Sequence, residues 1–73
     1  MLKPNAIEVG DRIWMEEFGY SEYWEITAPG EQVAGSPLVT FVVTTSSGSK
    51  VLRLAADVEW IVNRLPRKGR RKR

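Results

Sequence analysis

The sequence contains no cysteine and no histidine among its 73 residues. Disulfide bonds are therefore excluded, and the usual zinc sites built from Cys and His cannot be assembled. No apolar run approaches the roughly 20 residues that a membrane-spanning helix needs, and residues 1–12 lack the apolar stretch of a secretory signal. We therefore expect a cytoplasmic protein with no membrane span, whose small core holds without covalent or metal staples.

Groups that support catalysis are scarce as well. The glycines match neither of the standard nucleotide-binding fingerprints. Without His or Cys, the candidates for proton transfer are carboxylates, and four of them fall in one aromatic-rich segment: Glu16, Glu17, Glu22 and Glu25. A domain of 73 residues has little volume for a pocket that excludes water, so we interpret this segment as a solvated acidic loop. We expect neither an enzyme nor a cofactor.

What the chain does have is a sharp division of charge. Residues 1–63 contain nine acids and four bases, a net charge of −5, whereas residues 64–73 contain seven bases and no acid, a net charge of +7. A split of this kind marks a tail with a task of its own. The sequence therefore predicts a folded body over residues 1–63 and a basic, disordered tail over residues 64–73.

Strand patterns run through the first half of the body. Apolar residues alternate with polar ones from Ile7 to Glu16, with a turn or bulge expected at Gly10-Asp11. A loop is predicted for residues 16–21 and a strand for residues 23–28, with Trp24 and Ile26 on its inner face. Residues 29–37 hold two prolines and two glycines and predict a long loop.

The second half begins with the clearest strand, residues 38–45, which consist almost wholly of β-branched and aromatic residues. A turn at residues 46–49 and an alternating strand at residues 50–54, with Leu52 and Leu54 pointing inward, complete a hairpin. One helical turn at residues 55–57 then leads to a strand at 58–62, in which Val58, Trp60 and Val62 share a face. A short helix over residues 55–64 is the alternative.

Five short strands at close spacing indicate an all-β fold, a small five-stranded barrel whose closure hides the sheet edges. The opening Val9-Gly10-Asp11-Arg12-Ile13 and the order of elements over residues 7–63 resemble SH3-like small barrels, with residues 55–57 in place of that family's single-turn 3₁₀ link. The chain also resembles short barrel proteins of bacterial and phage genomes. It lacks the Ala-Leu-Tyr-Asp-Tyr signature of signalling SH3 domains, so binding of proline-rich peptides is not implied.

The tail suggests a partner. Closely spaced bases suit a phosphate backbone, where each contact releases condensed counterions and gives affinity without sequence choice. We therefore predict nucleic-acid binding, with these phosphate contacts: Arg64, Arg67, Lys68, Arg70, Arg71, Lys72 and Arg73. A solubilising end, an arm that folds back on the acidic body, and an acidic protein or membrane surface are the alternatives.

A cluster of aromatic residues in the first half suggests a second surface. Alternation sends Trp14 outward if Ile13 and Met15 face the core, and it sends Tyr23 outward if Trp24 faces the core. The surrounding glutamates would repel phosphate, so this patch fits a basic protein partner better than nucleobases. We predict protein interaction or self-association through Trp14, Tyr20 and Tyr23; the alternative is that these rings only cover a small core.

Overall fold

The computed structural model describes residues 1–17 and 19–64, without the side chains of Glu17 and Tyr20. A single 3₁₀ turn, η1 (Pro4–Ala6), precedes five strands, β1 (Arg12–Glu17), β2 (Tyr20–Ile26), β3 (Leu38–Thr45), β4 (Gly48–Ala55) and β5 (Val62–Asn63). All strand pairs are antiparallel, and they form one sheet in the order β4-β3-β2-β1-β5. The expected all-β fold with five antiparallel strands is confirmed.

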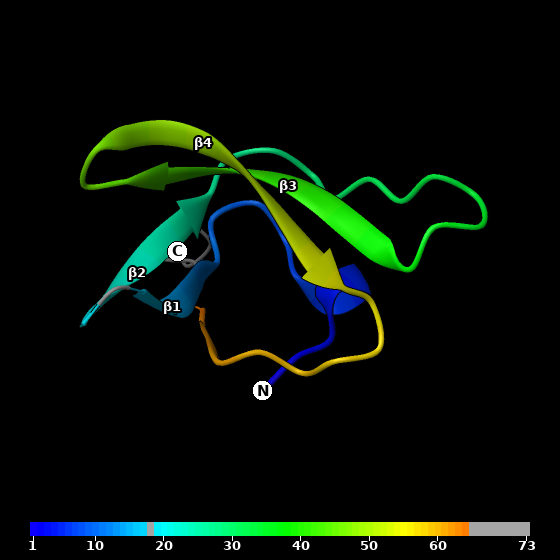
Figure 1. Ribbon diagram of the computed structural model, residues 1–73, viewed down its shortest axis with the longest axis horizontal. Helices are drawn as coiled ribbons and strands as arrows, with labels where there is room; N and C mark the ends of the chain where they lie inside the picture. The colour runs from blue at the N-terminus through cyan, green and yellow to red at the C-terminus, as the bar shows by residue number, and fades with distance from the viewer. Residues whose placement is uncertain (18, 65–73) are drawn as a thin grey trace, which may run out of the picture.

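The predicted closure into a barrel is wrong for the described residues. β4 and β5 are the two edges of the sheet, and no pairing joins them within residues 1–17 and 19–64. Figure 1 shows β3 and β4 as long arrows crossing above the shorter β1 and β2, while the segment after β4 returns along the opposite side. The molecule is therefore a strongly twisted open sheet.

Both hairpins are tighter than the sequence predicted. β1 and β2 pair as far as Glu17 and Tyr20, so the loop predicted for residues 16–21 shrinks to the two positions between these strands. β3 has the bounds predicted for it, and β4 pairs back to Gly48 across a turn of Ser46 and Ser47. Two-residue connections match the twist of the flanking strands, which favours pairing up to the turn.

The core lies on the inner face of the sheet. Alternation places Ile13 on β1, Trp24 and Ile26 on β2 and Leu54 on β4 inward, as predicted, and all four are buried. Met15 and Leu52 are half-buried against them. The buried apolar residues form one cluster: Ile7, Ile13, Trp24, Ile26, Val39, Phe41, Val43 and Leu54.

The expected irregularity at Gly10-Asp11 is a turn joined to a β-bulge. The N–H of Asp11 donates to the carbonyl of Glu8 (3.1 Å), and Gly10, at the third position of this turn, has a φ of 97°. Gly10 donates to the carbonyl of Ile26, whose own N–H donates to the carbonyl of Asp11, so two residues oppose one. The strand expected from Ile7 therefore begins only at Arg12.

The segment after β4 departs most from prediction. Residues 56–61 form neither the strand expected at 58–62 nor the alternative helix; only Val62 and Asn63 pair with β1. Trp60 instead pairs with Leu2 through two backbone hydrogen bonds of 2.8 and 2.9 Å. Val58, expected to share a face with Trp60, is exposed. The predicted fifth strand is thus reduced to the two residues of β5.

A close contact with the core also explains one glycine of the long loop between β2 and β3. A Cβ atom at Gly30 would lie 2.6 Å from Cε1 of Phe41 and 2.9 Å from Cγ1 of Val39. Real Cβ contacts are longer, so any side chain here would push the loop away from the buried Phe41 ring. The loop thereby covers one end of β3.

We predict that Gly30→Ala lowers the free energy of unfolding by about 1–3 kcal/mol, because it overpacks the site beside Phe41. Urea unfolding measures this loss. The same substitution should cost less in a Phe41→Leu background, where the ring atoms nearest to the new methyl group are absent. An equal cost in both backgrounds would refute the steric explanation.

Candidate functional site

The outer face of the β1–β2 hairpin brings two of the predicted interaction residues together. Trp14 and Tyr23 are opposite each other in the register, and their rings meet edge to face with centroids 4.9 Å apart and planes at 64°. Such pairs stabilise a sheet beyond their area burial. Tyr23 is 41% exposed and Trp14 is half-buried, so the pair is accessible from solvent.

Charged groups frame this ring pair. The Arg12 guanidinium lies over the Tyr23 ring, 5.7 Å from its centroid, and Trp14 Nε1 donates to a carboxylate oxygen of Glu16 at 3.3 Å. Tyr20, the third predicted residue, begins β2 beside the hairpin turn; its side chain is outside the described part. We call Arg12, Trp14 and Tyr23 the ring face.

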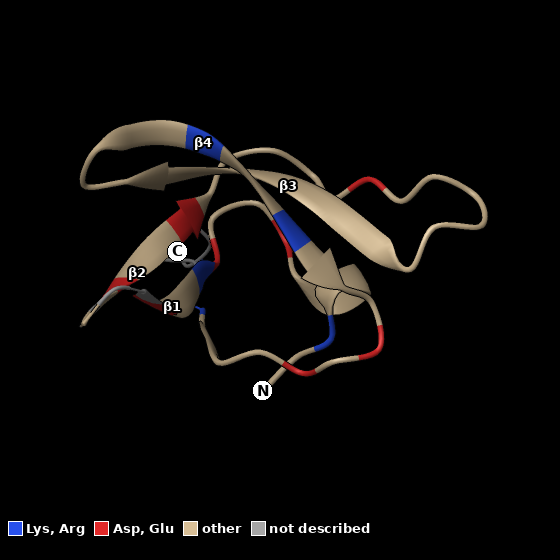
Figure 2. Ribbon diagram, viewed as in Figure 1, with Lys and Arg blue, Asp and Glu red and all other residues tan. Residues whose placement is uncertain are grey.

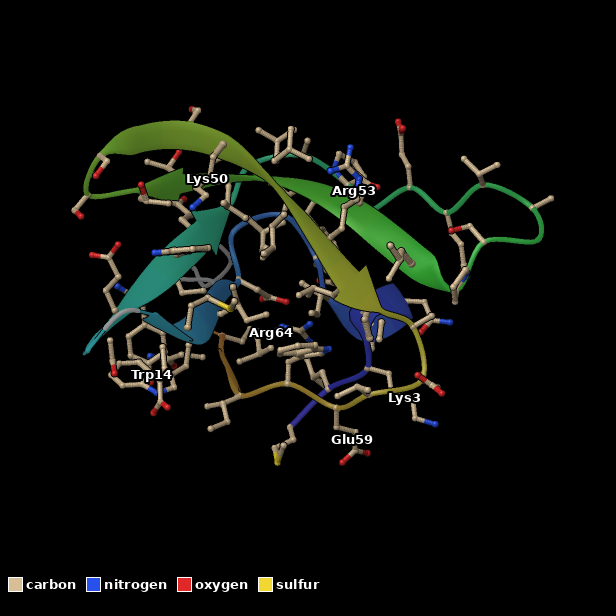
Figure 3. The ribbon with its side chains drawn as sticks, in the orientation of Figure 1. Lys3, Trp14, Lys50, Arg53, Glu59 and Arg64 are labelled. Carbon is tan, nitrogen blue, oxygen red and sulfur yellow. The ribbon has the colours of Figure 1, made fainter. Side chains whose placement is uncertain are left out.

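A shallow groove opens on the other side of Trp14. Its volume is about 360 Å³, and it lies between β1 and the segment that follows β4. The lining residues are Met1, Trp14, Met15, Glu16, Glu59, Trp60 and Ile61. Figure 3 shows Trp14 and Glu59 on these two elements. Nothing in the sequence pattern predicted this groove, because it depends on the Leu2–Trp60 pairing between distant segments.

Arg64, predicted as a phosphate contact, is hydrogen-bonded to the body. Its Nε donates to Oδ1 of Asp11 at 2.8 Å, and its Nη2 donates to Oδ2 of Asp11 at 2.9 Å and to the carbonyl of Ala6 at 3.0 Å. The Asp11 side chain is 3% exposed, whereas that of Arg64 is 43% exposed. The hydrogen bonds to Asp11 raise the pKa of the Arg64 guanidinium.

At the hairpin end of the inner face, a polar cluster caps the core. Trp24 Nε1 donates to a carboxylate oxygen of Glu22 at 2.7 Å, Ser46 Oγ donates to the same oxygen at 3.2 Å, and Lys50 Nζ lies 4.4 Å from the centroid of the Trp24 rings. These hydrogen bonds, led by the one from Trp24, lower the pKa of Glu22. A general acid at neutral pH needs a raised pKa, so the shift runs against such a role.

The remaining predicted phosphate contacts, Arg67, Lys68, Arg70, Arg71, Lys72 and Arg73, lie outside the described residues. Within residues 1–17 and 19–64, no group of three acidic side chains is placed to hold a metal ion. The same part of the chain contains no helix long and apolar enough to cross a membrane.

Comparisons with protein-family models, curated proteins and solved structures find no match to this chain.

We predict that Glu22 titrates below its ordinary pKa of 4.5, because both hydrogen bonds favour the carboxylate. Its folded pKa is depressed, so the stability it contributes is present above the unfolded pKa and is lost as the pH falls through the folded pKa. Side-chain carboxyl shifts measured by NMR against pH report this titration.

Ser46→Ala should raise the pKa of Glu22 part of the way back, because one donor is removed. Ser47→Ala is the matched control, since that neighbouring hydroxyl makes no hydrogen bond to Glu22 in the described structure. Equal titration midpoints in the wild type and in Ser46→Ala would rule out the proposed cause.

Proposed function

We propose that this protein is a non-catalytic, cytoplasmic accessory protein that binds nucleic acid, with residues 67–73 contacting phosphates and the folded body acting as their scaffold. The division of charge carries this proposal: six of the seven residues from Arg67 to Arg73 are basic and none is acidic. Backbone phosphates attract such a segment whatever the base sequence.

The folded body supports the proposal because it pairs Arg64 with Asp11 and carries a net negative charge. Asp11 pairs with Arg64, so the predicted phosphate contacts that remain are the six bases of residues 67–73. Figure 2 shows acidic residues on β1, on β2 and on the segment after β4, and basic residues on β4. The net charge of residues 1–63 is −5, so the body as a whole repels phosphate, and we assign the affinity to the tail.

Affinity for duplex DNA should fall steeply with salt, with a slope of log K against log salt on the order of −5 if all six bases engage. Deleting residues 67–73 should abolish binding and leave the Asp11–Arg64 pair in place. Titration of both proteins against duplex DNA, single-stranded DNA and RNA at two salt concentrations measures this. Binding that survives the deletion at full strength would contradict the proposal.

A role as a protein-interaction module is the second candidate, favoured by the ring face. Tyr23 is exposed beside Trp14 and Arg12, and exposed aromatic and arginine side chains are enriched in the energetic centres of interfaces. Self-association through the same rings would be its homotypic form.

Tyr23→Ala should weaken capture of a stoichiometric partner by the immobilised protein, or dissociate a homo-oligomer seen by sedimentation. Thr44→Ala is the matched control, because Thr44 is exposed on the neighbouring strand β3 and is not part of the ring face. Equal capture, or equal sedimentation, by the two variants would count against the module.

We also propose kinship with SH3-like small barrels and with the short barrel proteins of bacteria and phages. The order of the five antiparallel strands and the Gly10-Asp11 bulge ahead of β1 support this proposal, although the sheet is open.

A further inference from the structure

The outer edge of β1 is only partly covered. β5 pairs with Arg12 and Ile13, and Trp14 adds one hydrogen bond, from its N–H to the carbonyl of Ile61 at 2.9 Å. Beyond this point the returning chain turns away to pair Trp60 with Leu2. Within residues 1–17 and 19–64, no backbone pairs with Glu16 on this side. Backbone groups of an open edge are a template for an added strand.

The groove described above runs beside this open edge. Met15 and Trp60, both half-buried against the core, give it apolar surface. Two acids, Glu16 and Glu59, also line it, one from each of the facing elements, and none of its lining residues is a lysine or arginine. An open edge, an apolar surface and a negative rim therefore coincide in one place.

We propose that this groove binds an extended, basic segment of a partner protein, which adds as a strand beside Trp14–Glu16 of β1. Its backbone would pair with the open edge at Glu16, in the mode known as strand addition. Because side chains alternate along a strand, apolar residues would contact Met15 and Trp60 while arginines reach Glu16, Glu59 and the Trp14 ring.

The direction of β5 leads away from the open edge, so the edge is not filled by a direct continuation of this strand, and we assign it to a partner segment. β5 runs antiparallel to β1, with Val62 opposite Ile13 and Asn63 opposite Arg12. The chain therefore reaches Arg64 at the Asp11 end of β1, whereas the open edge lies at the Glu16 end. The site shares Trp14 with the ring face but does not include the Tyr23 ring, and it does not rest on the proposed binding of nucleic acid.

Fluorescence anisotropy with a labelled peptide of alternating arginine and valine, RVRVRVRVR, tests the proposal on the full-length protein. The peptide should bind, and an EVEVEVEVE peptide should not, because the rim is acidic. A peptide with prolines in place of the valines keeps the arginines but cannot add a strand, so it should bind much more weakly. Equal binding of the proline and valine peptides would overturn strand addition.

Charge reversal locates the site. Glu16→Lys and Glu59→Lys should each weaken binding of RVRVRVRVR by about tenfold, since like charges then face the arginines. Glu31→Lys, the same change on the exposed loop before β3, should alter it by about twofold or less at physiological salt, because distant charges are screened. Equal losses in all three variants would show that the net charge of the protein causes the effect, and would contradict binding of the peptide in the groove.

Two further measurements complete the test. Tyr23→Ala should bind the peptide as the wild type does; a loss as large as that of Glu16→Lys would move the site to the ring face and overturn the proposal. Deletion of residues 67–73 removes six positive charges, so this comparison is made at a salt concentration that screens distant charges, where the affinity should stay unchanged. A marked gain in affinity at that salt concentration would identify the chain's own tail as the occupant and would contradict a partner segment. Urea unfolding confirms that each variant is folded.

Discussion

The bidentate ion pair between Asp11 and Arg64 is the interaction on which the arrangement of η1, the bulge before β1 and the residue after β5 depends. Asp11 is buried at the bulge before β1, where its carboxylate accepts hydrogen bonds from the backbone N–H of Glu8 and from the Arg64 guanidinium. Arg64 also donates to the carbonyl of Ala6 at the end of η1. A buried carboxylate is costly unless it is paired and hydrogen-bonded, so these partners are needed together.

This pair joins three segments that are far apart in the sequence. It holds η1, the bulge and the chain after β5 against the same end of β1. The Leu2–Trp60 pairing joins the segment after β4 to the N-terminal residues at a second point. The groove exists because that segment is fixed at Arg64 and at Trp60 while leaving the edge of β1 at Glu16 uncovered. The groove thus depends on the same contacts that hold the N-terminal residues and the segment after β4 together.

Local patterns predicted the parts of the fold that depend on local chemistry. The bounds of β3 follow from its run of β-branched and aromatic residues, and the inward positions of Ile13, Trp24 and Leu54 follow from alternation. Open sheet edges and a two-residue β5 could not be predicted in this way, because the path of residues 56–61 is decided by Leu2, a residue of no local pattern. Tertiary contacts overrode the alternation at Val58, which is exposed, whereas Trp60 and Val62 pack against the core as predicted.

In the candidate site, too, local patterns predicted some contacts and missed those between distant residues. Alternation was enough to bring Trp14 and Tyr23 to one face, whereas Arg64 was grouped with the tail because it is the first of seven bases. Its pairing with Asp11 spans 53 residues, and only the strand-like residues just before it hinted that the body extends to this point. The division of charge in the sequence thus falls one residue before the last described residue, Arg64.

A double-mutant cycle at Asp11 and Arg64 tests this account most directly. Urea unfolding would be measured for Asp11→Asn, Arg64→Gln and the variant carrying both. Arg64→Gln leaves the buried Asp11 carboxylate without its cation, and Asp11→Asn weakens both hydrogen bonds from Arg64. We therefore predict that both lower the unfolding midpoint and that the double variant is scarcely less stable than the worse single one. Additive losses, or an Arg64→Gln variant as stable as the wild type, would contradict the central role of this pair.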